Sequence, residues 1–482
     1  MREEFLMVTR KPSFFMSSAL IAAIVVILAV SILHYQVAPQ IPILTASILL
    51  SFYGLKLGFT WKQLESAIVK GILYGLPSIL ILCLIGILIG IWVLNGTVPT
   101  LSYYGLHILS PSYFLVSAVL ICGVVSVLTG SSWSAIGTMG VALMGVAYGM
   151  GISPAMAAGA IVCGSVFGDK ISPLSDTTNL ASATAKVPIF DHIRHMLWTT
   201  IPSLVLTLIL FAFFAISDRA ADTAGIETMI RTLSERFTIT PLTLLSPLVI
   251  IVLAFKRVDA IPTLVVGLLV AIVTSFFTVP GISAGRLMSV AHFGYKSETG
   301  VEAIDKLLSL GGLSSMMFAV SLIILALAFG GLVKEIGLVH TIIDRIKRYL
   351  NKKGNVISAT VLSSVGVNVI IGECYLSIIL PGQMLESSYK RLKLHPKNLS
   401  RTLEDAGTIV HPIVPWGVSG AFIMATLNIG MEYVLYSFMC FITPLLAIVF
   451  GYTGFAIAPI GEEGEMEAYE EKFEIGMNNS SM

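Results

Sequence analysis

Residues 164–181 read GSVFGDKISPLSDTTNLA, and this stretch decides how the rest of the chain is interpreted. It places the carboxylates of Asp169 and Asp176, the ammonium of Lys170 and several hydroxyl groups inside a long apolar run. A charge at the centre of a bilayer costs roughly 2.5–3.5 kcal/mol on insertion scales, so ionisable residues in such a run are functional candidates.

The polar residues of this stretch recur at helical spacing and would share one face of a helix. They are Ser165, Gly168, Asp169, Ser172, Ser175, Asp176 and Asn179. Pro173 breaks that helix, because it supplies no N–H and its ring clashes with the carbonyl of Asp169. Carboxylate, hydroxyl and freed carbonyl oxygens together suit a small hard cation. The stretch therefore predicts an ion site.

The composition places the chain in a membrane. Hydrophobic residues make up 56% of it and charged residues only 12%, with a mean hydropathy of +0.90, which is far from the usual composition of soluble domains. The net charge of +1 and the absence of a basic tract give no reason to expect a nucleic-acid partner. The five cysteines have no metal-binding spacing, so we expect buried thiols and no cofactor.

Apolar runs along the chain fall into two similar sets. The first covers 14–37, 39–59, 67–95, 112–147, 154–186 and 197–217, and the second covers 241–255, 258–279, 313–336, 356–387, 401–427 and 433–455. A spanning helix needs about 20 residues, so 112–147 and 356–387 can each hold two short helices. We expect re-entrant hairpins there, because non-helical backbone is tolerated where it lines a cavity. The alternative is two full crossings joined by a tight turn.

The charge pattern predicts an orientation. Counting each hairpin as no net crossing leaves five spans per half, and this odd number inverts the second half relative to the first. With the N-terminus inside, basic residues gather in the inner loops, above all at 345–353 and 390–401, as the positive-inside rule requires. The predicted parts are a cytoplasmic N-terminus (1–13), a first repeat (14–217), an extracytoplasmic linker (218–240), a second repeat (241–456) and an acidic cytoplasmic tail (457–482).

A second broken helix follows the second hairpin, at 400–420, SRTLEDAGTIVHPIVPWGVSG. Pro412 and Pro415 free the carbonyls of Thr408 and His411. A broken helix after each hairpin is the pattern by which inverted-repeat transporters build a site at the membrane midplane. The expected fold is thus an all-α polytopic membrane protein with an inverted structural repeat, each half containing five transmembrane helices and one hairpin.

The runs GDKISPLSDTTNLA and EDAG…HPIVPWG resemble the signature of the NhaC-type sodium/proton antiporter family, within the broad ion-transporter superfamily. The resemblance extends over most of the chain. It implies exchange of internal sodium for external protons. The same family is also similar to exchangers that couple sodium and protons to malate and lactate. The superfamily implies a scaffold and a mobile transport unit, often in a homodimer.

The carboxylates receive distinct expected roles. Asp176 is expected to bind sodium directly, or else only to cap a half-helix. Asp169 is expected to share the sodium and carry the proton, or else to form a static pair with Lys170 or with an amide of the hairpin. Lys170 is expected to neutralise the site or to take part in coupling. Asp405 and Glu373 complete the ion and proton coupling group. Hydroxyl and amide ligands are expected at Ser131, Ser132, Ser172, Ser175, Thr177, Thr178, Asn179, Asn368 and Thr408.

His411 is the candidate pH sensor, because histidine titrates near neutrality; a plain structural histidine is the alternative. Glu404 ranks lower, since it can pair with Arg401 or face the cytoplasmic end. The chain contains no HExxH or Gly-x-Gly-Asp motif, so we expect no enzyme. We expect sodium and protons to compete for one midplane carboxylate site, with surrounding lipid as the other partner. An organic-anion exchanger is the alternative, and a passive channel is disfavoured.

Overall fold

The computed structural model describes residues 12–35, 37–217, 223–256, 258–301, 304–305 and 308–460. Every regular element in these ranges is a helix, which confirms the all-α prediction. Most of the predicted N-terminal segment 1–13 and of the acidic tail 457–482 lies outside the described residues.

Six helices among the described residues are long and apolar enough to cross a membrane. These are α4 (Leu76–Leu94), α6 (Phe114–Thr129) with the short η2 before it, α11 (Ile189–Ser217), α14 (Ala260–Thr278), α17 (Leu313–Ile336) and α19 (Lys353–Ile371). The number rises to nine if each of three bent helix pairs is a single span. A multi-pass membrane protein is therefore confirmed.

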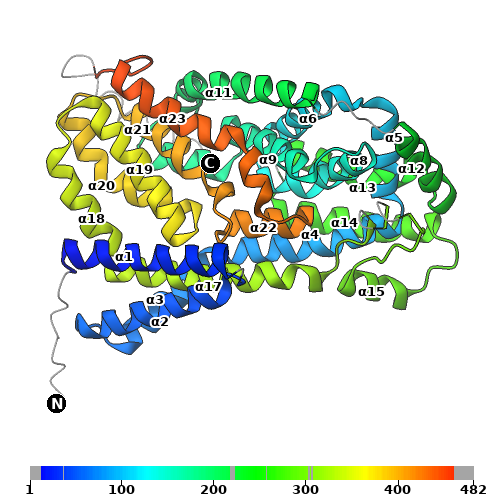
Figure 1. Ribbon diagram of the computed structural model, residues 1–482, viewed down its shortest axis with the longest axis horizontal. Coiled ribbons are helices and arrows are strands. Elements are labelled where there is room, and N and C mark those ends of the chain that lie inside the picture. Colours follow the sequence, from blue (N-terminus) through cyan, green and yellow to red (C-terminus); the bar gives the residue numbers. More distant parts are fainter. Residues whose placement is uncertain are drawn as a thin grey trace.

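One layer of the molecule is built around α17, which packs against α2 (Gln40–Lys56), α3 (Trp61–Tyr74) and α4. Figure 1 shows α1 (Phe14–Ala29), α2, α3 and α17 together along one side. Small residues allow the close approach of α3 and α17. A Cβ on Gly331 would lie 2.2 Å from the carbonyl oxygen of Ala67, so only glycine fits there.

Two helical hairpins form the other main feature. In the first hairpin, α6 ends at Gly130. It is followed by α7 (Ser132–Ala135), the π-helix η3 (Ile136–Gly140) and α8 (Val141–Gly149). In the second, α19 ends at Gly372 and α20 (Cys374–Arg391) follows. Both turn glycines have a positive φ, +66° and +73°, which a residue with a Cβ adopts only with strain. In Figure 1 α19 and α20 lie to the left of α9 and α22, and α8 lies to their right, with α5 and α12 beyond it.

The chain breaks close to the predicted prolines. The first broken pair is α9 (Pro154–Ile171) and α10 (Asp176–Thr184), bent by 48°. The second runs from α21 (Pro396–Leu403) through the π-helix η6 (Glu404–Thr408) and η7 (His411–Ile413) to α22 (Val418–Leu427), bent by 45°. Each break packs on the tip of its own hairpin: Ser172 Oγ donates to the carbonyl of Val127 at 2.8 Å, and the Val418 N–H donates to the carbonyl of Gly372 at 2.9 Å.

Connections between the predicted apolar runs contain further helices. The connection between the runs 67–95 and 112–147 is α5 (Thr97–Ile108), which packs against α8. The Asn95 side chain accepts the Thr97 N–H at 2.9 Å, and Thr97 Oγ1 donates to the carbonyl of Thr243 at 2.7 Å. The start of α5 is thus held by a residue far away in sequence. The remaining helices are α12 (Thr223–Arg236), η4 (Pro241–Leu244), α13 (Leu245–Phe255), α15 (Ala284–Phe293), α18 (Leu338–Ile346), η5 (Lys347–Tyr349), η8 (Met431–Tyr436) and α23 (Phe438–Thr453).

The length of the first helix of each hairpin decides whether that helix could cross the membrane completely. Residues 111–129 and α19 are each 19 residues long and apolar, a length close to the roughly 20 residues of a full crossing. The alternative of two full crossings joined by a tight turn therefore stays open, and the re-entrant hairpins and the inverted repeat stay predictions.

Candidate functional site

A cavity of about 150 Å³ lies where the two hairpin tips and the two broken helices meet. Most of its polar lining belongs to residues that the sequence predicts as site residues. The polar lining is Ser78, Ser131, Ser132, Asp169, Asp176, Thr177, Glu373, Tyr375, Thr408, His411 and Ser419. One wall comes from the first hairpin and α9–α10, and the other comes from the second hairpin and the η6–α22 segment.

Asp169 reaches the cavity from the last turn of α9. Its position depends on close packing of α9 against α6, where a Cβ on Gly168 would lie 2.2 Å from the carbonyl oxygen of Gly123. Ser132 Oγ donates to Asp169 Oδ2 at 2.7 Å, while Oδ1 is buried without a hydrogen-bond partner. The alternative pair of Asp169 with Lys170 does not form, because the Lys170 ammonium contacts the carboxylate of Asp405 instead.

Asp176 is the first residue of α10 and is exposed to the cavity. Its Oδ1 accepts the N–H of Thr177 at 2.8 Å, and the hydroxyl of Tyr375 donates to its Oδ2. The capping residue proper is Ser175, whose Oγ accepts the N–H of Thr178. Asp176 thus begins the half-helix and also presents a carboxylate to the cavity.

Glu373 forms the tip of the second hairpin. Its two oxygens accept the N–H groups of Tyr375 and Leu376 at 3.0 and 2.8 Å, so it caps α20. The corresponding position of the first hairpin is Ser131, whose Oγ accepts the N–H of Ser134 at 3.2 Å. Both tips therefore place a capping side chain at the cavity, one neutral and one acidic.

Lys170 and Asp405 do not line the cavity. They form a fully buried ion pair with each other, and Thr199 Oγ1 also donates to Asp405 at 2.8 Å. The Arg401 guanidinium is fully buried too, with Nε 3.9 Å from Asp405 Oδ2. This arrangement joins α9, α11 and the α21–η6 segment behind the site.

Glu404 is more deeply placed than the sequence indicates. It is fully buried, and its Oε1 accepts a hydrogen bond from Thr177 Oγ1 at 3.2 Å, while Oε2 has no partner. Its expected alternative partner, Arg401, instead donates to the carbonyl of Ala456 at 2.8 Å. Glu404 lies in a π-helical turn, which shifts side-chain directions relative to an α-helix. No pattern in a single sequence predicts that turn.

Several predicted ligands hold the backbone breaks together and do not line the cavity; these are Ser172, Ser175, Thr178, Asn179 and Asn368. Thr178 Oγ1 donates to the carbonyl of Asp169 at 3.3 Å, and the Ser172 N–H donates to it at 3.1 Å. The carbonyl that Pro173 frees is thus already occupied. Asn368 Nδ2 donates to the carbonyl of Gly407 at 2.6 Å.

His411 lines the cavity with both ring nitrogens engaged. Nε2 lies 3.1 Å from the carbonyl of Gly372, and Nδ1 lies 2.9 Å from Ser419 Oγ. A carbonyl only accepts, so Nε2 carries a proton, and in the neutral ring Nδ1 accepts from the serine. A role of His411 in pH sensing stays a prediction, as does a plain structural role.

The carboxylates at and beside the cavity lack positive partners. In the described part of the chain, no lysine or arginine forms an ion pair with Asp169, Asp176, Glu373 or Glu404. No three His, Cys, Asp or Glu side chains of the described residues could together hold a metal ion. Carboxylates in such an environment are costly to leave charged, so they favour a bound cation or protons.

The sequence was compared with known families. The model of the Na+/H+ antiporter family matches residues 164–455, a segment that includes the break of the first broken helix, the second hairpin and the whole second broken helix. The chain belongs to the Na+/H+ antiporter family.

Full-length relatives support this assignment to the antiporters. The chain is 47% identical to the Na+/H+ antiporter NhaC of Alkalihalophilus pseudofirmus, over 91% of this chain and 95% of that protein. It is 42% identical to NhaC of Bacillus subtilis, over 89% of this chain and 95% of that protein. The malate-2H+/Na+-lactate antiporter of B. subtilis is more distant, at 37% identity over 83% and 86%. All three are named as antiporters, which agrees with the prediction of a transporter and not an enzyme.

Proposed function

We propose that this antiporter exchanges cytoplasmic sodium for external protons by alternating access at the cavity between the hairpin tips. The observation that carries the proposal is a single cavity lined by both tips and by carboxylates without positive partners. Sodium and protons are the two ligands that neutralise such groups. Asp169 and Asp176 bind sodium together with oxygens from Ser132, Thr177 and the tips, and they release protons as they do so.

Contacts between the two halves define what must change during transport. Tyr375 from the second hairpin donates to Asp176 of the first broken helix. Thr177 donates to Glu404 of the second broken helix. These hydrogen bonds close the cavity between the halves, so opening toward either side requires that one of them breaks. Glu404, one hydrogen bond behind the cavity, extends the proton-binding group beyond the carboxylates named from sequence.

The arrangement of the hairpins supports opposed entrances. Along the long axis in Figure 1 they lie on opposite sides of α9 and α22, and their tips line one cavity. This is the arrangement that an inverted repeat produces, with one hairpin facing each side of the membrane. In this proposal the basic segments 345–353 and 390–401 face the cytoplasm together with both termini, and the protein resides in the cell membrane, surrounded by lipid.

An organic-anion exchanger is the second candidate, because the malate and lactate antiporter is a relative. A carboxylate substrate needs a cationic or amide-rich pocket. No lysine or arginine is among the residues that line the cavity, and the basic Lys170 is already paired behind it. The lining therefore favours inorganic cations. A homodimer remains an expectation from the superfamily resemblance alone.

Purified protein in liposomes distinguishes these two functions. A sodium gradient should change the internal pH at the same rate with and without malate or lactate. Stimulation of proton movement by either anion, or movement of labelled anion with sodium, would support the second candidate instead.

A further inference from the structure

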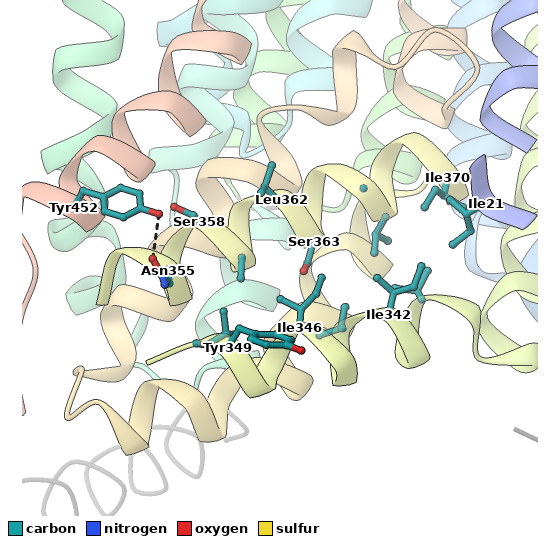
Figure 2. Close-up of a pocket in the computed structure, with 16 residues that line it drawn as sticks. Ile21, Ile342, Ile346, Tyr349, Asn355, Ser358, Leu362, Ser363, Ile370 and Tyr452 are labelled. Atoms are coloured by element: carbon teal, nitrogen blue, oxygen red, sulfur yellow. Dashed lines mark hydrogen bonds between the residues drawn. The ribbon is translucent and has the colours of Figure 1, made fainter. Parts of the chain in front are cut away.

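A second cavity runs along α19, the first arm of the second hairpin, and its lining reaches Ile370, two residues before the tip at Gly372. It is a groove of about 340 Å³ between α18 and α19, bordered by Ile21 of α1 and Tyr452 of α23. Figure 2 shows Ile342, Ile346 and Ile370 along its length. Its wall is almost entirely apolar, as expected of a surface that meets lipid chains.

Gly366 of α19 opens the middle of this groove. It is among the lining residues, and a Cβ placed on it would meet no atom within 4 Å. Among the helical glycines of the described residues, Gly285 of α15 also has no atom within 4 Å of an added Cβ. A glycine that no packing requires in a membrane helix costs helix stability relative to alanine. Because no side chain fills the space beside Gly366, that space is available to a ligand.

The chemistry changes at one end of the groove. Tyr349, Asn355 and Tyr452 gather there, and Tyr452 Oη donates to Asn355 Oδ1 at 3.2 Å. Ser358 Oγ lies beside them, buried and without a hydrogen-bond partner. Tyrosines with an apolar ring and a polar hydroxyl are typical of the boundary between hydrocarbon and headgroups.

The same end carries positive charge. The connection from α18 to α19 reads RIKRYLNKK at 345–353, and Tyr349 at the groove end is part of it. Lys347 pairs with Asp344 at 3.2 Å. No acidic partner is recorded in the described chain for the other basic residues, Arg345, Arg348, Lys352 and Lys353, all of which are exposed. We call this connection the basic turn.

We propose that the groove and the basic turn bind one anionic phospholipid, with an acyl chain along α18 and α19 and the phosphate at the basic turn. Basic pockets between membrane helices are suited to anionic headgroups. A second copy of the chain fits less well, because it would bring the same uncompensated charge to this face. Since α19 leads to the tip at Gly372, the bound lipid holds the arm of the second hairpin against α18. The proposal does not depend on the transported ions.

Native mass spectrometry of the full-length protein in detergent tests the proposal. Phosphatidylglycerol and phosphatidylcholine with the same acyl chains are the probes. We expect one retained phosphatidylglycerol in the wild type and its loss in Gly366→Leu, whose Cβ would meet no atom within 4 Å and whose side chain would occupy space in the groove. Gly285→Leu is the matched control and should retain the lipid. Replacing Arg345, Arg348, Lys352 or Lys353 by glutamine should lower the preference for phosphatidylglycerol by about fivefold per charge.

Three results would overturn the proposal. The first is equal retention by the wild type and Gly366→Leu, and the second is equal retention of the two lipids by the wild type. The third is a change from dimer to monomer in Gly366→Leu with lipid content unchanged, since the groove would then be a subunit interface.

Discussion

At the residue scale, the acidic groups fall into two environments. In the described chain Asp169, Asp176, Glu373 and Glu404 accept hydrogen bonds from hydroxyls and N–H groups and form no ion pair, whereas Asp405 has a lysine and an arginine beside it. The four carboxylates without an ion pair can exchange a proton for a cation without leaving a buried positive charge unpaired. Asp405 cannot change its charge without leaving buried positive charge unpaired.

Replacing a cavity carboxylate by its amide should stop transport without unfolding the protein. Asp176→Asn and Asp169→Asn keep the shape of the side chain but lose its charge, so sodium-driven proton movement in liposomes should fall to background. Glu404→Gln should also slow it strongly. The exposed Asp191→Asn is the control and should be normal. Normal exchange by a folded variant would remove that residue from the coupling group.

The buried ion pair should matter for stability more than for coupling. Asp405→Asn leaves the Lys170 ammonium unpaired, and breaking a buried pair in this way costs about 3–5 kcal/mol. Thermal unfolding in detergent should therefore occur at a clearly lower temperature. The double variant Lys170→Met with Asp405→Asn should recover part of that loss and retain transport, because only the Arg401 guanidinium then lacks its carboxylate. A stable double variant that transports nothing would show instead that the pair takes part in coupling.

At the element scale, helix breaks and tight packing place the site. Proline positions and glycine-flanked polar tips are local signals, so the broken helices and the tips that carry Ser131 and Glu373 can be predicted from sequence. The contact of Tyr375 with Asp176, and that of Glu404 with Thr177, join segments some 200 residues apart. Such pairings depend on tertiary packing, as does α5, whose first turn is held by Thr243.

The close packing of α9 on α6 should be sensitive to a single methyl group. In Gly168→Ala the new Cβ would lie 2.2 Å from the carbonyl oxygen of Gly123, so α9 must shift and carry Asp169 away from Ser132. We expect a loss of about 1–3 kcal/mol in stability, together with slower transport. Gly285→Ala, which adds its methyl to open space, should change neither. Unchanged transport in Gly168→Ala would mean that this contact does not position Asp169.

At the scale of the whole molecule, the account requires that the two hairpins open to opposite sides. Cysteines introduced near Ser131 should react with hydrophilic thiol reagents from outside, and those near Glu373 should react from the cytoplasm. The background must lack the five native cysteines. Labelling of both tips only from one face would contradict the inverted repeat and the alternating access that depends on it.

The central claim is that sodium and protons compete for the same carboxylates. The most direct measurement is the apparent sodium affinity of the purified protein in liposomes from pH 6 to 9, read from internal pH after a sodium jump. Protonation removes the negative charge that binds sodium, so the affinity should fall steadily as the pH is lowered, and saturating sodium should restore part of the rate. An apparent affinity that stays constant across this range would contradict the shared site.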